Sequence, residues 1–558
     1  GSSIVKCTLT GSQSLKMRSK MSSGCAIAAR ILFVGAIFLL GILLVITVRT
    51  VQLYYRDTGT GTHQPSVKYV EKFNSEETDQ LVEKLRQSIR FRTISYGLDD
   101  ARSKSMSNES SRQFRELTTF LEKTFPRAFG GHKFVIRHLG HEGDGDFFPS
   151  ILLHVKGKNH SLPEYLLCAH LDVVPADSHW ADGRDPFEPA EFSQKRDRFL
   201  YGRGAIDNKH NLLSILEAVD GLTQQPTRGF YVAFGHDEEI SGLNGAYKMA
   251  KYIGRQLNGK KLAFAMDEGL YVLNGALPGV IDQPIASIGV AEKGYLTVSV
   301  SATSEAGHSA IPPPHDSAIT KLAEALTRFT GDTHPAGLPQ LQRDAFWALA
   351  PHAKFPYNVL MANLWIFEPL VLNLMNGFRH LAALIRTTTA VTVIVGGVKE
   401  NVLPSEAHAI INHRILQDSS VHETMERDRK LIEGLPVKIE LREGREPVPT
   451  NHLNGSSTNT PEVGMTALRQ TMTAVFPSAI VTPWLCIAGT DSRHYVELTN
   501  FIYRFSPLIV HMNDAARVHG SDERIEGDQY RQMCNFYWHL IRTMNSISDD
   551  CLSESELQ

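Results

Sequence analysis

Short apolar runs alternate with segments of helical periodicity along most of the chain. The run from Tyr165 to Val174 is apolar except for His170 and Asp172 and is closed by Pro175, which indicates a buried strand. Other strand-like runs are expected at 134–138, 150–155, 230–234 and 262–266, and amphipathic helices at 76–91, 114–125 and 212–219. Alternation of this kind predicts an α/β fold, a doubly wound mixed sheet between helices.

Polar residues able to bind a cation stand at the ends of these runs. They are His170, Asp172, Asp207, Glu238, Glu239 and Asp267. Four consecutive strand ends are expected to carry them, and the carboxyl ends of strands in a doubly wound sheet line the ligand crevice. Carboxylates and imidazole without cysteine suit divalent ions such as Zn²⁺.

Each of these residues also has a simpler explanation when it is taken alone. His170 could be a hydrogen-bonded core histidine, Asp207 a helix N-cap, and the acids at 237–239 a solvated loop end. Three adjacent acids at the end of an apolar strand would repel one another unless a cation or solvent absorbs their charge. The set as a whole therefore favours a metal centre.

The N-terminal part of the chain contains one membrane-length segment. Residues 31–48 are apolar and uncharged, close to the minimum that crosses a bilayer as a helix. Basic residues without acids precede them, which predicts a type II signal anchor with 1–30 cytosolic and the rest lumenal or extracellular. A cleaved signal peptide, and hence a secreted form, is the alternative, but 49–55 is bulky and basic rather than small. Residues 49–66 are expected to be a stalk.

The pattern of apolar and polar residues changes after Ala291. Alternation at 295–302, with strand-like segments at 391–395, 408–414 and 437–441, predicts an α+β domain that closes over the crevice as a lid or mediates dimerisation. The expected domains are a catalytic part at 67–292, the inserted domain at 293–450, a second catalytic part at 451–546 and a tail at 547–558.

The inserted domain contains a strongly apolar stretch at 355–384. Glu368, Pro369 and Arg379 interrupt it, so a second membrane span is not expected. Three interpretations stay open: the core of the insert, a subunit interface, or a groove for an apolar substrate chain.

Composition narrows the classes of partner. The 558 residues are 42% hydrophobic, enough for more than one domain, and 57 basic against 60 acidic residues leave no basic stripe for nucleic acid. Six cysteines are few for an extracellular chain, and Cys168, Cys486, Cys534 and Cys551 are expected to be reduced. Sequons at Asn108, Asn159 and Asn454 fit a glycoprotein of the secretory route.

Five short motifs that contain the candidate ligands follow one another along the chain. They are His170-Leu171-Asp172, Gly204-Ala205-Ile206-Asp207, Asp237-Glu238-Glu239, Asp267-Glu268-Gly269 and His519-Gly520. In order and spacing they resemble the M20 family of di-zinc metallopeptidases, from about residue 76 to residue 544. The segments 367–370, 385–390, 401–404 and 489–493 resemble its N-fatty-acyl-amino-acid synthase/hydrolase and carboxypeptidase S groups.

The resemblance implies two Zn²⁺ per subunit. Its implied ligands are His170 and Asp267 for one ion, Glu239 and His519 for the other, and Asp207 bridging both. Asp172 would orient His170, and Glu238 would be the general base that deprotonates the water between the metals and returns the proton to the leaving nitrogen.

The resemblance also implies substrate-binding residues. They are His308, Asn401, Arg414, Gly489 and Thr490. The first three lie in the inserted domain, through which a homodimer is expected. Whether His308 serves its own subunit or a neighbour is left open.

Three functions are weighed. The first is a zinc amidohydrolase that cleaves, and in reverse forms, the amide bond of N-fatty-acyl amino acids. The second is a membrane-anchored carboxypeptidase or dipeptidase. An inactive binding module is disfavoured because Glu238 and all five implied ligands are present.

Overall fold

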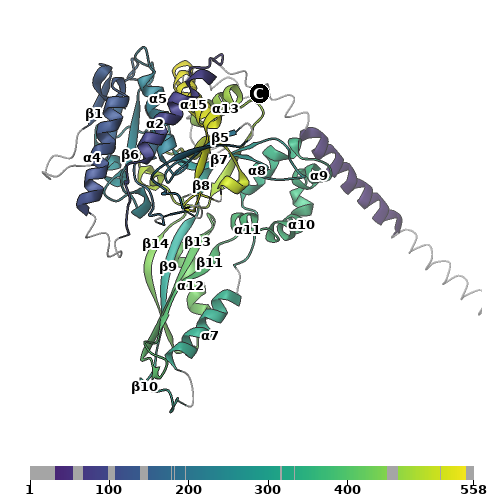
Figure 1. The fold of residues 1–558 in the computed structure, drawn as a ribbon. Helices are drawn as coiled ribbons and strands as arrows, with labels where there is room; N and C mark the ends of the chain where they lie inside the picture. Colours follow the sequence, from purple (N-terminus) through teal and green to yellow (C-terminus); the bar gives the residue numbers. More distant parts are fainter. Residues whose placement is uncertain are drawn as a thin grey trace, which may run out of the picture.

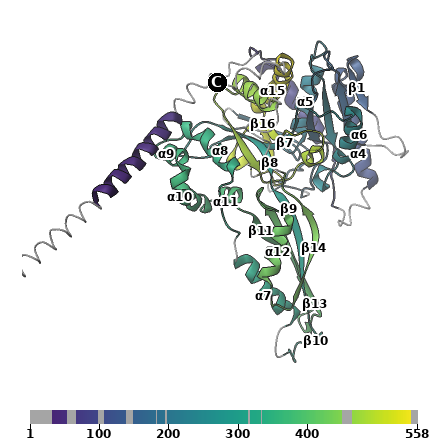
Figure 2. The ribbon, with the colours of Figure 1, turned by 180° about the vertical axis from the view of Figure 1, so that it is seen from behind.

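The computed structural model describes residues 32–53, 67–97, 107–138, 149–177, 179–180, 183–194, 197–313, 317–331, 334–448, 463–515 and 517–547. Figure 1 shows a large α/β unit, which we call the body, and a narrow unit that projects from it, which we call the arm. A separate N-terminal helix extends to the side. Figure 2 shows the same three parts from behind.

The body is built on a mixed sheet of eight strands. In spatial order these are β1 (Val135–His138), β2 (Ile151–Val155), β6 (Phe230–Gly235), β3 (Tyr165–His170), β7 (Ala265–Asn274), β16 (Ile502–His511), β8 (Ile285–Glu292) and β15 (Ile480–Cys486). The central strands β6, β3, β7 and β16 are parallel, and β1 and β2 are antiparallel to their neighbours. The predicted mixed α/β sheet is confirmed.

Helices cover both faces of this sheet because its strands are apolar on both sides. Leu167 and Ala169 of β3 belong to one buried cluster, while Leu166 and Cys168 face the other. The first face carries α2 (Thr78–Ile89), α4 (Ser107–Thr124), α5 (Lys209–Asp220), α13 (Val463–Val475) and α15 (Gly527–Ser546), and the second carries α6 (Ala246–Leu257).

One expectation about the strands is wrong. Asp207 does not follow a strand of the main sheet, because β5 (Asp197–Tyr201) pairs with β4 (Ala190–Gln194) and β17 (Arg524–Glu526) in a separate antiparallel sheet. A glycine-containing turn then leads to α5, whose N-cap is Asn208 rather than Asp207.

The arm is an antiparallel sheet with two helices on one face. Its strands are, in spatial order, β11 (Thr388–Gly396), β13 (Glu406–Ile415), β9 (Gly294–Thr303) and β14 (Val437–Arg445), and its helices are α7 (Ala318–Gly331) and α12 (Val421–Leu431). Its core is distinct from that of the body. The short strands β10 (Gly307–His308) and β12 (Val402–Leu403) pair at the tip, far from the body (Figure 1).

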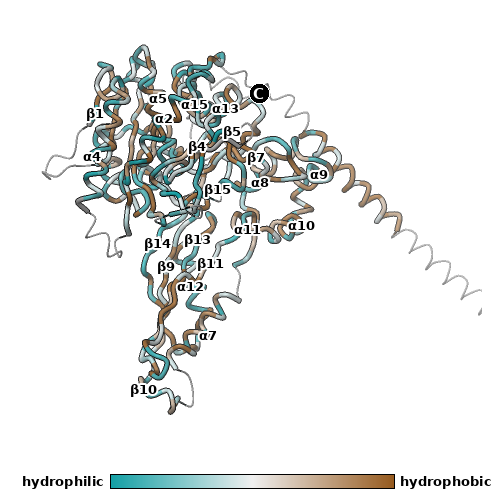
Figure 3. The backbone as a smooth tube through the Cα atoms, in the orientation of Figure 1, coloured by the Kyte–Doolittle hydropathy of each residue, from teal (hydrophilic) through white to brown (hydrophobic). Residues whose placement is uncertain are grey.

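The apolar stretch at 355–384 does not lie in the core of the arm. It forms α9 (Tyr357–Ala362), α10 (Leu364–Asn376) and α11 (Arg379–Ile385), which follow α8 (Gln340–Leu349) beside the body. Leu364, Val371 and Leu384 join the buried cluster of the body. The tube of α10 is coloured largely as hydrophobic in Figure 3.

The remaining elements are short. They are α14 (Met512–Ala515) and the helical turns η1 (Ser75–Glu77), η2 (Arg127–Gly131), η3 (Glu238–Ile240), η4 (Ala350–His352) and η5 (Asp491–Tyr495).

The N-terminal helix runs from Leu32 to Leu53 and is long and apolar enough to cross a membrane. Cys168, Cys486 and Cys534 are buried free thiols, as predicted. Cys551, the sequon at Asn454 and the segments 1–30 and 548–558 lie outside the described residues, whereas Asn159 lies on the surface.

Candidate active site

His170 stands at the carboxyl end of β3 and is buried. Its Nδ1 donates to the Asp172 carbonyl oxygen at 2.9 Å, which leaves the lone pair on Nε2. Nε2 lies 3.0 Å from Asp207 Oδ1 and 3.1 Å from Glu268 Oε1. Two carboxylates thus lie close to the free nitrogen of one imidazole, an arrangement that is typical of a metal-binding site.

Asp172 supports this arrangement from behind. One carboxylate oxygen lies 3.3 Å from His170 Nδ1. The same carboxylate accepts from the backbone N–H groups of Glu238 and Glu239, each at 3.2 Å. Asp172 therefore fixes the imidazole and the turn η3 together, so the two glutamates follow β6 into the crevice in a defined orientation.

Asp207 lies between two imidazoles. Its Oδ1 faces His170, and its Oδ2 lies 2.8 Å from His519 Nε2. His519 is also 3.3 Å from Glu239 Oε2. The structure thus brings together four of the five predicted ligands, with Asp207 between the two imidazoles.

The fifth predicted ligand, Asp267, belongs to neither of the two groups of closely spaced ligand atoms in the described residues. Its Oδ1 accepts from the backbone N–H of Glu268 at 2.9 Å, while its Oδ2 is buried without a hydrogen-bond partner among the described residues. The strand is irregular at this point: Asp267 pairs with Arg504 of β16, but the next paired residue is Leu270. This bulge turns Glu268, rather than Asp267, toward His170.

Sequence reasoning missed Glu523, which holds two ligand loops together. Its buried carboxylate accepts from the backbone N–H groups of Gly204, Ile206 and Asp207 at 3.1, 2.6 and 3.0 Å. It also binds Arg203 Nη1 at 2.8 Å, and Arg203 Nη2 donates to the His519 carbonyl oxygen at 3.1 Å. The only sequence signal is its place four residues after His519.

The carboxylates of the site are crowded and poorly solvated. Burial, then the Glu268 carboxylate, raise the pKa of Glu238 well above its usual range. Burial and the charge of Asp207 raise the pKa of Glu239 to about 7, while burial raises that of Glu268 to about 8. Hydrogen bonds to Asp207 and Glu239 raise the pKa of His519 to about 10. The protein alone therefore leaves excess negative charge here, which a cation would neutralise.

The donor set fits divalent metal ions. His170 with Glu238 and Glu268, and His170 with Asp207 and Glu239, each offer ligand atoms that all lie within 4.8 Å of one another. Glu239 Oε1 is buried without a hydrogen-bond partner. Oxygen and imidazole ligands in this proportion suit zinc and similar ions.

A cleft of about 480 Å³ lies between the body and the arm, next to η3. Its basic lining residues are Arg445, Arg493 and His494. Arg445 of β14 donates to Ser241 Oγ at 3.0 Å, so the arm contacts the loop that follows Glu239. Sequence reasoning did not single out Arg445 or His494.

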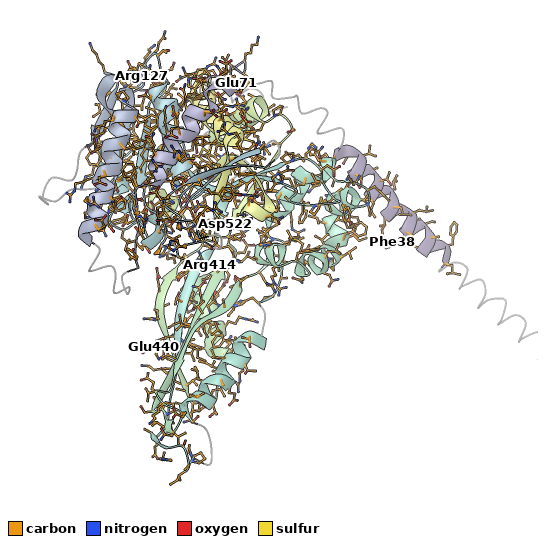
Figure 4. The ribbon with its side chains drawn as sticks, viewed as in Figure 1. Phe38, Glu71, Arg127, Arg414, Glu440 and Asp522 are labelled. Carbon is orange, nitrogen blue, oxygen red and sulfur yellow. The ribbon has the colours of Figure 1, made fainter. Side chains whose placement is uncertain are left out.

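The five predicted substrate-binding residues fall into two places. Arg414 lies at the end of the arm that joins the body (Figure 4), with its guanidinium 4.9 Å from the ring centre of Tyr295. Gly489 and Thr490 follow β15 beside Asp267. His308 and Asn401 are exposed at the tip of the arm, where the Ser309 N–H donates to the Asn401 carbonyl oxygen at 3.2 Å.

Comparisons with known proteins agree with this geometry. A model described as peptidase family M20/M25/M40 matches residues 166–543. The N-fatty-acyl-amino acid synthase/hydrolase of Xenopus tropicalis is 35% identical over 520 residues, covering 92% of this chain and 95% of the relative. The probable carboxypeptidase S-like 2 of Dictyostelium discoideum is 33% identical and covers 90% of this chain and 92% of the relative.

Solved structures share the fold. Human carnosine dipeptidase 1 aligns with a TM-score of 0.60 at 15% identity, covering 85% of this chain and 97% of that chain.

Proposed function

Because this chain belongs to peptidase family M20/M25/M40 and is a hydrolase of amide or peptide bonds, we propose that it cleaves the amide bond of N-fatty-acyl amino acids and also forms it in reverse. The observation that carries the proposal is the near full-length similarity to the Xenopus synthase/hydrolase, together with a complete set of ligand-type residues and a buried glutamate in one crevice.

Two Zn²⁺ ions fit the site. Glu268, in preference to Asp267, would hold one ion with His170, Glu239 and His519 would hold the other, and Asp207 would contribute to both, since these side chains face one another. When bound, such ions lower the pKa of water and stabilise an oxyanion.

Glu238 is the proposed general base. It belongs to the cluster around His170, and its backbone is fixed by Asp172, so its carboxylate can accept a proton from the attacking water and pass it to the leaving nitrogen. Burial raises the pKa of Glu238, which helps its carboxyl hold the transferred proton before the proton passes to the leaving nitrogen.

The substrate carboxylate would be bound at the junction of arm and body. Arg414 offers a planar, permanently charged fork there, and Gly489 and Thr490 follow the end of β15 beside Asp267. His308 and Asn401 lie at the other end of the arm, so we propose that they act in the crevice of a second subunit of a homodimer formed through the arm.

The N-terminal helix is proposed to anchor the enzyme as a type II membrane protein with the body outside the cytosol. Exposed Asn159 of the sequon 159–161 would then be available for glycosylation.

A membrane-anchored carboxypeptidase or dipeptidase is the alternative, and the similarity to the Dictyostelium carboxypeptidase S-like protein supports it. Parallel rates on N-oleoyl-phenylalanine and on an unblocked dipeptide such as alanyl-phenylalanine separate the two. We expect faster cleavage of the acyl amino acid, with both activities lost in Glu238→Gln. Faster cleavage of the dipeptide would favour the alternative.

A further inference from the structure

Helix α10 is apolar on two opposite faces although only one of them is buried. Leu364, Val371 and Met375 pack inward. Ile366, Leu370 and Leu374, which are spaced four residues apart, are exposed on another side. A helix that is hydrophobic all round is normally enclosed by protein or by lipid.

The exposed apolar surface extends beyond α10. Phe355, Trp365 and Phe378 are 80%, 49% and 63% exposed, and Tyr357 adds a fourth aromatic side chain. Glu368 is the one charged residue in 355–378, and its carboxylate is paired with Arg343 at 2.6 Å. We call the exposed side chains of Phe355, Tyr357, Trp365, Ile366, Leu370, Leu374 and Phe378 the apolar patch.

Two surface helices of the arm differ from α10. Helix α12 presents Glu426, Arg429 and Lys430 to solvent, and α7 presents Glu324 and Arg328. Those helices carry the charged outer face expected of a helix in water. The apolar patch, on α9, α10 and the residues that flank them, therefore lacks the charged outer face of these two helices of the arm.

The apolar patch is continuous with the N-terminal helix. Asn363 Nδ2 donates to Thr50 Oγ1 at 3.1 Å and lies 3.5 Å from the Ile46 carbonyl oxygen. Leu53 packs in a buried cluster with Met361 and Ala362 of α9. Figures 1 and 2 both show α9 and α10 beside the same end of that helix.

This contact sets the depth of α10 relative to a bilayer. The helix Leu32–Leu53 has 22 residues, so it is about 33 Å long at 1.5 Å per residue. That length matches a hydrocarbon core of about 30 Å. Thr50 and Ile46 lie three and seven residues before Leu53, so Asn363 would sit about 5 to 10 Å below the outer end of the helix, which is the depth at which an interfacial helix buries its apolar face.

We propose that α9 and α10 form a second membrane contact, in which the apolar patch lies in the outer leaflet of the bilayer that the N-terminal helix crosses. With 13 residues α10 is too short to span a bilayer. It has the length and aromatic content of an interfacial helix, because tryptophan and tyrosine concentrate at the membrane boundary.

The consequence concerns access to substrate, and it rests on the proposed membrane anchor and acyl-amino-acid activity. Helices α10 and α11 adjoin β15, which leads directly to Gly489 and Thr490. A patch seated in the leaflet would hold this edge of the crevice close to the surface from which an amphiphilic substrate is drawn.

Tryptophan fluorescence in bilayers tests the contact without any substrate. The full chain is reconstituted into nanodiscs of phosphatidylcholine brominated near the headgroup, whose bromine quenches nearby indoles. We expect Trp365→Phe to remove part of the quenched emission, whereas Trp538→Phe, on α15 of the body, should leave the quenched emission unchanged. Both substitutions are conservative, and circular dichroism verifies the fold.

The outcomes separate the patch from the anchor. A chain that enters nanodiscs but shows equal quenching in wild type and Trp365→Phe would overturn the membrane contact and leave the anchor standing. A chain that does not enter nanodiscs would overturn both. Two copies per nanodisc with Trp365 shielded from lipid would instead assign the apolar patch to a dimer interface and overturn the proposal.

A functional measurement adds a second test. Ile366→Glu/Leu370→Glu should lower the rate on N-oleoyl-phenylalanine held in vesicles by about tenfold, since each charge opposes insertion. Its rate on soluble N-acetyl-phenylalanine should stay at the wild-type level. Glu324→Lys/Arg328→Glu on α7 is the matched control. An equal vesicle rate in all three proteins would contradict the role in substrate access.

Discussion

The two ends of the arm differ in how completely one chain organises them. Near the body, His170, Asp207 and Glu239 are each held by buried partners of the same chain, among them Asp172 and Glu523. At the tip, His308 is exposed and its Nδ1 accepts only a local hydrogen bond from the Ala310 N–H at 3.1 Å. The two ends are far apart: strand β13, which runs along the arm, has 10 residues and is therefore about 33 Å long at 3.3 Å per residue. This difference is what we would expect if the tip acts in the crevice of a second subunit, as proposed above.

The strongest test of the crevice is Glu238→Gln, which removes the proposed base and keeps its shape. Turnover should fall by about 10² to 10⁴, while metal content and the melting temperature stay unchanged. Glu440→Gln, the same change on an exposed strand of the arm (Figure 4), is the control and should have wild-type kinetics. A Glu238→Gln enzyme with normal rates would remove Glu238 from the chemistry.

Subunit mixing tests whether His308 at the tip of the arm acts in the crevice of a second subunit. Glu238→Gln and His308→Ala should each be nearly inactive, because each lacks one essential group in every crevice. After the two are mixed and allowed to exchange subunits, activity should recover to about a quarter of wild type, since half of the dimers would carry one intact crevice. No recovery, despite exchange verified by mass photometry, would place His308 in its own subunit or outside the reaction.

Glu523→Gln tests whether the buried Glu523 carboxylate stabilises the two loops that carry Asp207 and His519. It removes the buried partner of the Arg203 guanidinium, so the free energy of unfolding should fall by about 3 kcal/mol. Asp282→Asn breaks the exposed Lys354 pair and should cost about 1 kcal/mol or less. Urea titrations of the two proteins give the comparison. An equal, small loss in both would mean that Glu523 contributes little to the loops.

Metal affinity distinguishes Glu268 from Asp267. Asp267→Asn should weaken zinc binding by about 10- to 100-fold, as removal of a supporting group does. Glu268→Gln should weaken it further, because a side chain that faces His170 is altered. Competition with a chelator followed by metal analysis measures both. The opposite order would restore the motif-based assignment of Asp267 as the ligand.

Much of the crevice could be predicted from sequence because strand ends converge by topology. Apolar runs placed His170, Glu238 and Glu239 at the ends of β3 and β6, and these strands are indeed neighbours. Asp207 was predicted in the site for a partly wrong reason, since its strand belongs to another sheet. The glycine-containing turn and Glu523 bring it into place instead.

Other features depend on contacts that no local pattern records. The bulge next to Glu268, whose carboxylate faces His170, arises where β7 pairs with β16, a strand more than 200 residues away. Glu523 carries no motif of its own. The stretch at 355–384 is apolar whether it packs on the arm, on the body or against lipid, so its composition alone left its location undecided.

Arg414 lies at the boundary between the two regions, and Arg414→Lys is expected to have the smallest effect. Tyr295 lies between two guanidinium groups, those of Arg414 at 4.9 Å and Arg445 at 5.5 Å from its ring centre. Stacking orients the planar fork of Arg414, and lysine can reproduce neither the stacking nor a two-pronged contact with a carboxylate.

If Arg414 binds the substrate carboxylate, its replacement by lysine should reduce the preference for an N-acyl amino acid over its carboxamide by about tenfold. A change of this size corresponds to the loss of one hydrogen bond to a charged group. The loss should come from slower handling of the acid. Arg445→Lys is the matched control: it alters the other face of the same ring, while its side chain is already engaged by Ser241 and Glu443. Its acid-to-amide ratio should therefore remain that of the wild type. Equal ratios in all three enzymes would instead show that Arg414 only stiffens the joint between arm and body, because a stiffening role affects both substrates alike.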